Sequence, residues 1–164
     1  MSQFLIRPAR KEDCLIILDL IRGLAKYEKL EDQCVATVEL LENSLFSEKP
    51  DCYSVIAWEL DELGDEIPVG FALYFFNYST FLSRRGLYLE DLFVVPQFRG
   101  KGYGKRIMQF LAKTAVEKGC GRFEWSVLDW NQPAINFYQK IGAVVMPDWR
   151  ICRMTGKSLK SFAK

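Results

Sequence analysis

The chain has 164 residues, with 22 basic and 21 acidic side chains and a formal net charge of +1. Hydrophobic residues make up 49% of it and charged residues 26%, which excludes a disordered protein and predicts a single domain over residues 1–164. The sequence lacks a polybasic run, an acidic tail, an apolar segment of ~20 residues and a secretory signal pattern, so we expect no nucleic-acid partner and no membrane partner.

The amino-terminal half alternates between predicted strands and helices. Apolar residues at helical spacing predict a helix over about residues 12–27. Thr37 is placed to cap a second helix, with Leu40, Leu41 and Leu45 facing inward. Runs of apolar and β-branched residues predict the strands of this half, which are residues 4–7, 53–58 and 69–76.

A glycine-rich turn follows the next predicted strand, residues 86–95. Three glycines within residues 100–104 let the backbone turn sharply and approach a bound group closely. An amphipathic helix follows, and it points its first N–H groups and the positive end of its dipole into the turn. Such a junction binds phosphate anions. Cationic side chains gather there: Arg99, Lys101, Lys105 and Arg106.

Spacing excludes two familiar phosphate-binding loops. A Walker loop requires Ser or Thr after its Gly-Lys pair, whereas Lys105 is followed by Arg106. A dinucleotide fingerprint requires Gly-x-Gly-x-x-Gly at the start of a βαβ unit, whereas here Arg-x-x-Gly-x-Gly follows what look like antiparallel strands. A turn that merely joins a strand to a helix is the alternative interpretation, and the clustered cations argue against it.

The carboxyl-terminal part predicts a strand at residues 122–128 and a short helix from Pro133 to about Gly142. Residues 144–146 and 151–154 are predicted to form closing strands before a short basic tail.

Two side-chain types restrict the chemistry. The five cysteines are scattered, odd in number and without a Cys-x-x-Cys pair, which favours reduced thiols and a cytoplasmic location. The chain has no histidine, so a histidine-assisted serine or cysteine nucleophile is impossible, and we expect no metal. Acid–base chemistry must come from carboxylate, tyrosine, lysine or cysteine groups.

The glycine turn resembles the acetyl-CoA loop, Gln/Arg-x-x-Gly-x-Gly/Ala, of the GNAT superfamily of acyl-CoA-dependent N-acetyltransferases, with Arg99, Gly102 and Gly104 at the matching positions. The apolar residues 92–96 before it and the Asn-Gln-Pro-Ala-Ile-Asn-Phe-Tyr segment at 131–138 extend this resemblance. It implies the mixed α/β GNAT fold, with a twisted mixed sheet of about six to seven strands flanked by helices on both faces. It also implies acetyl-CoA as co-substrate.

Longer motifs resemble the diamine acetyltransferases, the spermidine/spermine branch of this superfamily. These motifs are Leu-Ala-Lys-Tyr-Glu at 24–28, Tyr-Leu-Glu-Asp at 88–91 and Asn-Phe-Tyr at 136–138. Residues 78–80 and 128–131 favour the paralogue that acetylates thialysine and related lysine-like amines. One departure is the segment 147–149, Pro-Asp-Trp, which is shorter than the acidic turn of the family and weakens the case for long polyamines.

Acetyl transfer to an alkylamine requires deprotonation, because the free amine has a pKa near 10.4. By resemblance, Glu90 is the expected base, acting through an ordered water. Alternation along the predicted strand would place Tyr88, Glu90 and Leu92 on one face and Asp91 on the other. An exposed strand carboxylate is the alternative for Glu90. Tyr138 is the expected general acid for the leaving thiolate, and an amphipathic core tyrosine is its alternative.

The resemblance also implies the acetyl-CoA contacts. The backbone N–H of Leu92 is expected to bind the thioester carbonyl oxygen where two neighbouring strands splay apart. Residues 92–94 would bind pantetheine as an added strand would, and residues 100–105 would bind the diphosphate. The expected contact residues are Leu92, Phe93, Val94, Arg99, Gly100, Lys101, Gly102, Tyr103, Gly104, Lys105, Asn131, Gln132, Pro133, Ala134 and Tyr138. For Asn131 the alternative is a helix cap before Pro133.

A cationic amine requires carboxylates around it. The expected amine-binding residues are Tyr27, Glu28, Glu90, Glu124, Trp125, Ser126 and Asp148. For Glu28 the alternative is a solvated polar loop. Asp91 and Asp129 are weaker candidates.

The sequence therefore predicts an acetyl-CoA-dependent N-acetyltransferase acting on a thialysine-like amine, a diamine or a polyamine. Direct transfer in a ternary complex is expected because the nucleophile is the nitrogen of the substrate itself, and a homodimer is expected by resemblance. Acetylation of a protein or of an unrelated amine, such as an aminoglycoside, is one alternative. A non-catalytic acyl-CoA sensor is another, but a sensor would have no reason to keep both Glu90 and Tyr138.

Overall fold

The computed structural model describes residues 3–164. Residues 1 and 2 belong to the amino terminus that the sequence predicts to lack a secretory signal, and they lie outside the described residues. The chain divides into two compact units, the first ending at Ser126 and the second running from Val127 to Lys164.

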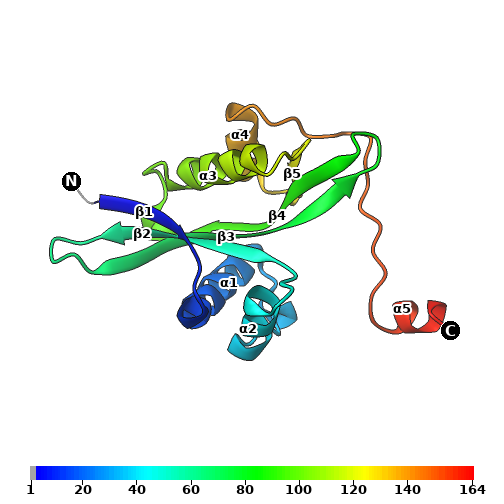
Figure 1. Ribbon diagram of the computed structural model, residues 1–164, viewed down its shortest axis with the longest axis horizontal. Helices are drawn as coiled ribbons and strands as arrows, with labels where there is room; N and C mark the ends of the chain where they lie inside the picture. The colour runs from blue at the N-terminus through cyan, green and yellow to red at the C-terminus, as the bar shows by residue number, and fades with distance from the viewer. Residues whose placement is uncertain (1–2) are drawn as a thin grey trace. The chain divides into compact units, whose positions relative to one another are not determined.

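The first unit is a sheet with helices on its two faces (Figure 1). Its strands are β1 (Gln3–Pro8), β2 (Tyr53–Leu60), β3 (Glu66–Ser79), β4 (Arg84–Val94) and β5 (Phe123–Trp125). Its helices are α1 (Cys14–Glu28), α2 (Val38–Phe46) and α3 (Tyr103–Glu117), with single 3-10 turns η1 (Lys11–Asp13), η2 (Glu31–Gln33) and η3 (Pro96–Phe98). The second unit contains α4 (Gln132–Lys140) and α5 (Gly156–Phe162).

The five strands lie in the order β1-β2-β3-β4-β5. Neighbouring strands are antiparallel from β1 to β4, whereas β4 and β5 are parallel and are connected through α3. Helices α1 and α2 lie on one face of the sheet and α3 lies on the other (Figure 1). The mixed sheet with helices on both faces confirms the predicted fold class.

Local sequence explains where the helices begin and end. The Thr37 hydroxyl accepts a hydrogen bond from the Leu40 N–H at 3.2 Å, so the predicted cap of α2 is confirmed. Leu41 and Leu45 are buried as predicted, but Leu40 is 55% exposed because it lies in the first turn on the outer side. Helix α1 ends at Glu28, because the next residue, Lys29, has a left-handed backbone (φ 60°) that stops further helical bonding.

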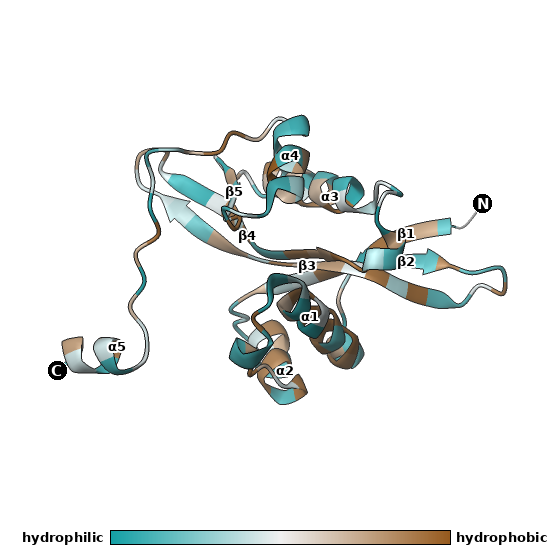
Figure 2. Ribbon diagram, turned by 180° about the vertical axis from the view of Figure 1, so that it is seen from behind, coloured by the Kyte–Doolittle hydropathy of each residue, from teal (hydrophilic) through white to brown (hydrophobic). Residues whose placement is uncertain are grey.

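The main core lies between α1, α2 and the sheet. Ile17 of α1, Ile56 of β2 and Phe71 of β3 are fully buried in it. Figure 2 shows hydrophobic residues concentrated along the middle of β3 and β4, between the helices of the first unit. Burial of these side chains, at about 1.5–3 kcal/mol each, is the main stabilising contribution to the sheet that carries the site.

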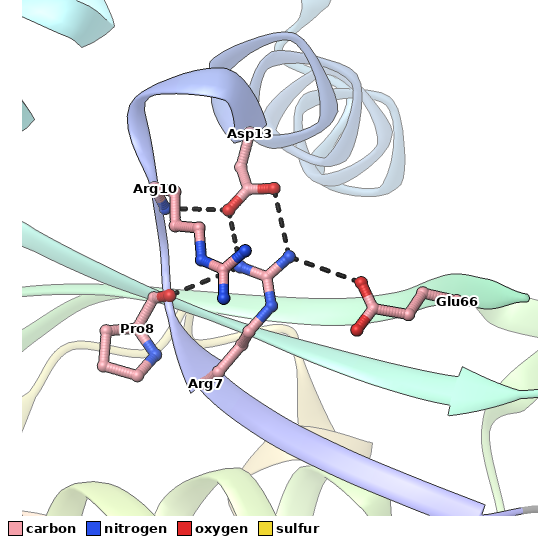
Figure 3. Close-up of polar contacts among 5 residues, drawn as sticks. All are labelled: Arg7, Pro8, Arg10, Asp13 and Glu66. Carbon is pink, nitrogen blue, oxygen red and sulfur yellow. Dashed lines mark hydrogen bonds and ion pairs between the residues drawn. The ribbon is translucent and has the colours of Figure 1, made fainter.

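A polar cluster joins the start of α1 to β1 and β3 (Figure 3). The carboxylate of Asp13, which is only 4% exposed, accepts hydrogen bonds from Arg7 Nη1 at 2.7 Å and from the Arg10 N–H at 2.7 Å. Arg7 also pairs with Glu66 at 3.4 Å, and its guanidinium lies 4.6 Å from the ring centroid of Trp58. Burial alone would raise the pKa of Asp13, but the bonds from Arg7 and Arg10 hold it below its usual value.

The described residues form five strands rather than the predicted six to seven. Residues 144–146 and 151–154, predicted as closing strands, have no strand pairing, and Val144 and Ile151 are 79% and 71% exposed. The predicted strand at 122–128 is reduced to Phe123–Trp125. A β-branched run satisfies the local preference for a strand, but a strand also requires a hydrogen-bonding partner that local sequence does not reveal.

Candidate active site

Glu90 lies at a break in the pairing of β3 with β4. Tyr74 pairs with Leu89 and Leu73 pairs with Asp91, so Glu90 is the extra residue of a β-bulge. Bulges interrupt the alternation of side chains along a strand. The bulge therefore changes which residues of β4 share a face.

The predicted grouping of Tyr88 with Leu92 on one face is wrong. Residues directly opposite each other in a sheet lie on the same face, and Tyr88 is opposite Phe75 while Asp91 is opposite Leu73. Phe75 and Leu73 are two residues apart on β3, so Tyr88 and Asp91 share the face of α1 and α2. Leu92 lies on the opposite face, because it pairs with Ala72.

Three carboxylates come together beside the bulge. Asp91 is half-buried, and burial, followed by the charges of Glu90 and Glu28, raises its pKa to about 6. Glu28, the last residue of α1, is also half-buried, and burial raises its pKa. Burial and the charges of Asp51 and Glu90 raise the pKa of the Cys52 thiol, which lies near the same group. Asp91 is thus a stronger candidate for amine binding than expected. The sequence signal that could have indicated the bulge is the pair of adjacent acidic residues, Glu90 and Asp91, within an otherwise apolar strand.

Beyond the bulge, every second residue of β4 directs its main-chain N–H and C=O groups away from β3. The Val95 N–H donates to the Val69 carbonyl at 2.9 Å, which makes these residues a hydrogen-bonded pair. Bonded and non-bonded pairs alternate in an antiparallel ladder, so Leu92 and Val94 direct their N–H and C=O groups away from β3. The Val94 carbonyl accepts a hydrogen bond at 2.9 Å from Arg99 Nε, as this orientation requires.

The neighbouring strand β5 does not follow β4 this far. Its pairing with β4 covers Leu87, Tyr88 and Leu89, and β5 ends at Trp125. Among the residues that the structure describes, no strand pairs with the outward edge of β4 at Leu92 and Val94. An extended ligand can use such an edge as a strand would.

The glycine turn leads from this edge into α3. Gly100 and Gly102 have φ values of +80° and +82°, a left-handed conformation that other residues rarely adopt. A Cβ at Gly102 would meet nothing within 4 Å, so the space beside the turn is open. The first bond of the helix joins the Arg106 N–H to the Gly102 carbonyl at 3.1 Å, so the N–H groups of residues 103–105 precede the helical ladder. This arrangement can bind an anion.

The side chains of the turn make contacts of their own. Lys101 Nζ pairs with Glu59 at 3.1 Å, and the Tyr103 hydroxyl donates to the same carboxylate at 2.7 Å. Arg106 lies over the ring of Phe4, 3.9 Å from its centroid. These contacts tie the side chains of Lys101, Tyr103 and Arg106 to β1 and β2, and the main-chain N–H groups of the turn remain as groups that could bind an anion.

The residues of β5 lie beside the bulge. The Tyr88 hydroxyl and Ser126 Oγ are 2.8 Å apart, which joins β4 to the end of β5. The Trp125 ring lies 4.9 Å from that of Phe123. Glu124 forms an ion pair with Arg122, so part of its charge is already neutralised.

The second unit carries the remaining expected residues. Asn131 is buried and caps α4, with its Oδ1 accepting from the Ala134 N–H at 3.4 Å, so the capping interpretation is confirmed. Gln132 donates to Asn136 at 2.7 Å.

Tyr138 is half-buried, and its ring lies 5.3 Å from that of Phe137. Remaining expected residues here are Pro133, in the first turn of α4, and Asp148, which is exposed.

Comparisons with known proteins show the family to which the chain belongs. The model of the acetyltransferase (GNAT) family matches residues 21–143, so the chain belongs to that family. A thialysine N-epsilon-acetyltransferase of Sus scrofa is 39% identical over 99% of both chains. An L-ornithine N5-acetyltransferase of Arabidopsis thaliana is 35% identical over 97% of this chain and 87% of its own. An integron cassette protein from the mobile metagenome of V. cholerae has 30% identity and a TM-score of 0.80, over 98% of both chains.

GNAT enzymes transfer an acetyl group from acetyl-CoA to an amine, so the chain is an N-acetyltransferase with acetyl-CoA as co-substrate. The predicted family, enzyme class and co-substrate are confirmed. Within residues 3–164, three or more cysteine or carboxylate side chains are nowhere grouped to hold a metal ion. In the same range, every helix is too short or too polar to cross a membrane.

Proposed function

We propose that this enzyme acetylates the primary amine of a small cationic substrate of the thialysine or lysine-like class. The observation that carries the proposal is the group of Glu28, Glu90 and Asp91 beside the bulge of β4. Carboxylates at this position attract an alkylammonium ion to the strand edge that can hold an extended cofactor arm. The full-length similarity to thialysine and ornithine acetyltransferases supports the same class of amine.

In this proposal Glu90 accepts the proton of the bound ammonium through an ordered water. The bulge supports this role, because it leaves Glu90 outside the regular ladder and exposed to water. Asp91 and Glu28 stabilise the cation before deprotonation, and Tyr27 forms the wall beside Glu28. Glu124, Trp125, Ser126 and Asp148 complete the amine-binding set, with Glu124 contributing least because of its ion pair with Arg122.

The neutral amine then attacks the thioester carbonyl carbon. The Leu92 N–H binds the carbonyl oxygen as negative charge develops there, which the outward orientation of this group supports. The carbon–sulfur bond breaks, and Tyr138 donates a proton to the departing thiolate of CoA. The nitrogen releases one of its two remaining protons to water as it becomes an amide, and the Tyr138 phenolate regains a proton from water. Both products leave from one ternary complex.

Main-chain groups hold acetyl-CoA in this proposal. Pantetheine pairs with residues 92–94, and the diphosphate binds the N–H groups of residues 100–105. Residues 131–134 contact the amide arm of the cofactor. The left-handed glycines of the turn and the outward edge of β4 support this arrangement.

We further propose that residues 1–164 form one functional GNAT domain, that the enzyme is a homodimer and that it is cytoplasmic. The family match spans residues 21–143 and so includes parts of both compact units, which supports one functional domain. The five cysteines are all free thiols, which agrees with a reducing compartment. The homodimer rests on the resemblance to the diamine acetyltransferases alone.

A panel of amines assayed with acetyl-CoA for thiol release tests the proposed function. Thialysine, lysine and ornithine should give the highest kcat/KM, with spermidine lower because the 147–149 segment is short. A peptide or an aminoglycoside that exceeds thialysine in kcat/KM would overturn the substrate class. Binding of acetyl-CoA without turnover of any amine would indicate a sensor.

A further inference from the structure

Arg99 connects the glycine turn to the end of α1. Its Nε donates to the Val94 carbonyl at 2.9 Å, on the outward edge of β4. Its guanidinium lies 4.5 Å from the ring centroid of Tyr27 and 5.7 Å from that of Phe93. One side chain therefore contacts both the strand edge proposed for pantetheine and the aromatic residue beside Glu28.

The Tyr27 ring borders open space. It lines a cavity of about 530 Å³ between α1 and the end of β4, together with Phe93 and Val95. The ring also packs against the core between α1 and the sheet, and the stacked guanidinium is a specific contact on its face. The electrostatic attraction between a guanidinium and an aromatic ring favours this stacked arrangement.

We propose that Arg99 is a positioning residue that couples the acetyl-CoA site to the amine site through Tyr27. The inference rests on the proposed function, because it takes the edge of β4 and residues 27–28 as the two sites. A guanidinium has five N–H groups, so Arg99 can keep its stack on Tyr27 while it meets a phosphate oxygen. The bound cofactor thereby orients the Arg99 side chain. Arg99 in turn orients the ring of Tyr27 beside the amine site.

The coupling must be reciprocal. If bound cofactor orders Arg99 and hence Tyr27, then amine binding orders Arg99 for the cofactor by the same factor. Coupling of this kind typically amounts to about fivefold or more in affinity. CoA carries no acetyl group, so the complex of the enzyme with CoA and thialysine cannot react. Binding of these two ligands therefore measures the coupling factor directly.

Calorimetric titration of CoA with and without saturating thialysine gives the coupling factor. In the unmodified enzyme thialysine should raise CoA affinity about fivefold. R99M and Y27L should each reduce the factor to near one, and the double variant should reduce it no further. R99K should keep CoA affinity within about twofold while losing the coupling, because an ammonium retains the charge but not the planar stack.

Arg106→Met is the matched control. It removes a cation from the first turns of α3 that also lies over an aromatic ring, that of Phe4, but does not touch Tyr27. This variant should weaken CoA binding through the lost charge and keep the coupling factor. The inference is overturned if R99M keeps the full coupling factor or if R106M loses the coupling factor as R99M does. A coupling factor of one in the unmodified enzyme would also overturn it. Failure of the unmodified enzyme to bind CoA would instead overturn the proposed function.

Discussion

Asp91 of β4 and Glu28 of α1 lie within electrostatic range of each other, on the face of the sheet that α1 and α2 cover. Burial of Asp91, with the charges of Glu90 and Glu28, raises its pKa to about 6. Asp91 therefore changes its charge within the physiological pH range.

Amine binding should strengthen as pH rises through 6. The substrate amine stays protonated throughout this range, so the added negative charge of Asp91 increases the attraction. We expect the KM for thialysine to fall about tenfold between pH 5 and 7.5, and Asp91→Asn to remove most of this change. Steady-state kinetics across this range provide the measurement. Asp19→Asn, a change of an exposed carboxylate on α1, should leave the profile unaltered. A similar profile in D91N would exclude Asp91 from amine binding.

The same carboxylate should reduce stability at neutral pH. The pKa of Asp91 is higher in the folded state than the unfolded value near 3.9, so the folded state is favoured while the group is protonated. Its stabilising effect is full below about pH 4 and is lost as pH rises through 6. Asp91→Asn should therefore raise the free energy of unfolding by about 2 kcal/mol at pH 7 and by little at pH 4. Urea titrations at both pH values test this, and lower stability of the variant at pH 7 would contradict it.

The sequence predicts the local features of this site well. The glycine turn at residues 100–102 and the helix after it depend on residues that are adjacent in the chain. The spacing of the glycines and of the apolar residues is therefore enough to identify the turn and the helix. The capping roles of Thr37 and Asn131 are equally local. Apolar runs mark most of the strands, although their ends are displaced by a few residues from the predicted ones.

Long-range relationships are not accessible in this way. The bulge at Glu90 depends on how β3 and β4 pair, and it reverses the face of Asp91 and Leu92. The stack of Arg99 on Tyr27 joins distant parts of the chain. The cation cluster is expected to face a phosphate, but Lys101 pairs with Glu59 of β2, which no local pattern indicates.

Removal of the Asp13 carboxylate should destabilise the first unit. Asp13→Asn leaves the Arg7 guanidinium without its main buried partner, so we expect a loss of about 2–4 kcal/mol in the free energy of unfolding. Because the pKa of Asp13 is lowered by folding, its contribution is present above about pH 4 and fades as pH falls below that. Glu66→Gln is the control, since this half-exposed partner at 3.4 Å should contribute under about 1 kcal/mol. Chemical denaturation at pH 7 distinguishes the two, and equal losses would refute the assignment.

Tyr138→Phe should lower kcat about tenfold to a hundredfold, because the thiolate of CoA then leaves without a proton donor. The Kd for acetyl-CoA should change little, since the phenyl ring keeps the packing against Phe137. Rapid-quench measurement of the chemical step, with calorimetry for binding, separates these effects. Unchanged turnover would remove Tyr138 from the mechanism.

Gly102→Asp should abolish acetyl-CoA binding. The residue has a φ of +82°, and its aspartate would place a negative charge beside the N–H groups proposed to bind the diphosphate. Gly64→Asp is the matched control, because Gly64 has a φ of +87° and a Cβ there would also meet nothing within 4 Å, but it lies in the β2–β3 hairpin. Both substitutions should cost about 1 kcal/mol of stability through left-handed strain. Only G102D should lose CoA affinity in calorimetry, by about a hundredfold or more. If G102D binds CoA as G64D does, the glycine turn is a structural connection and the diphosphate binds elsewhere.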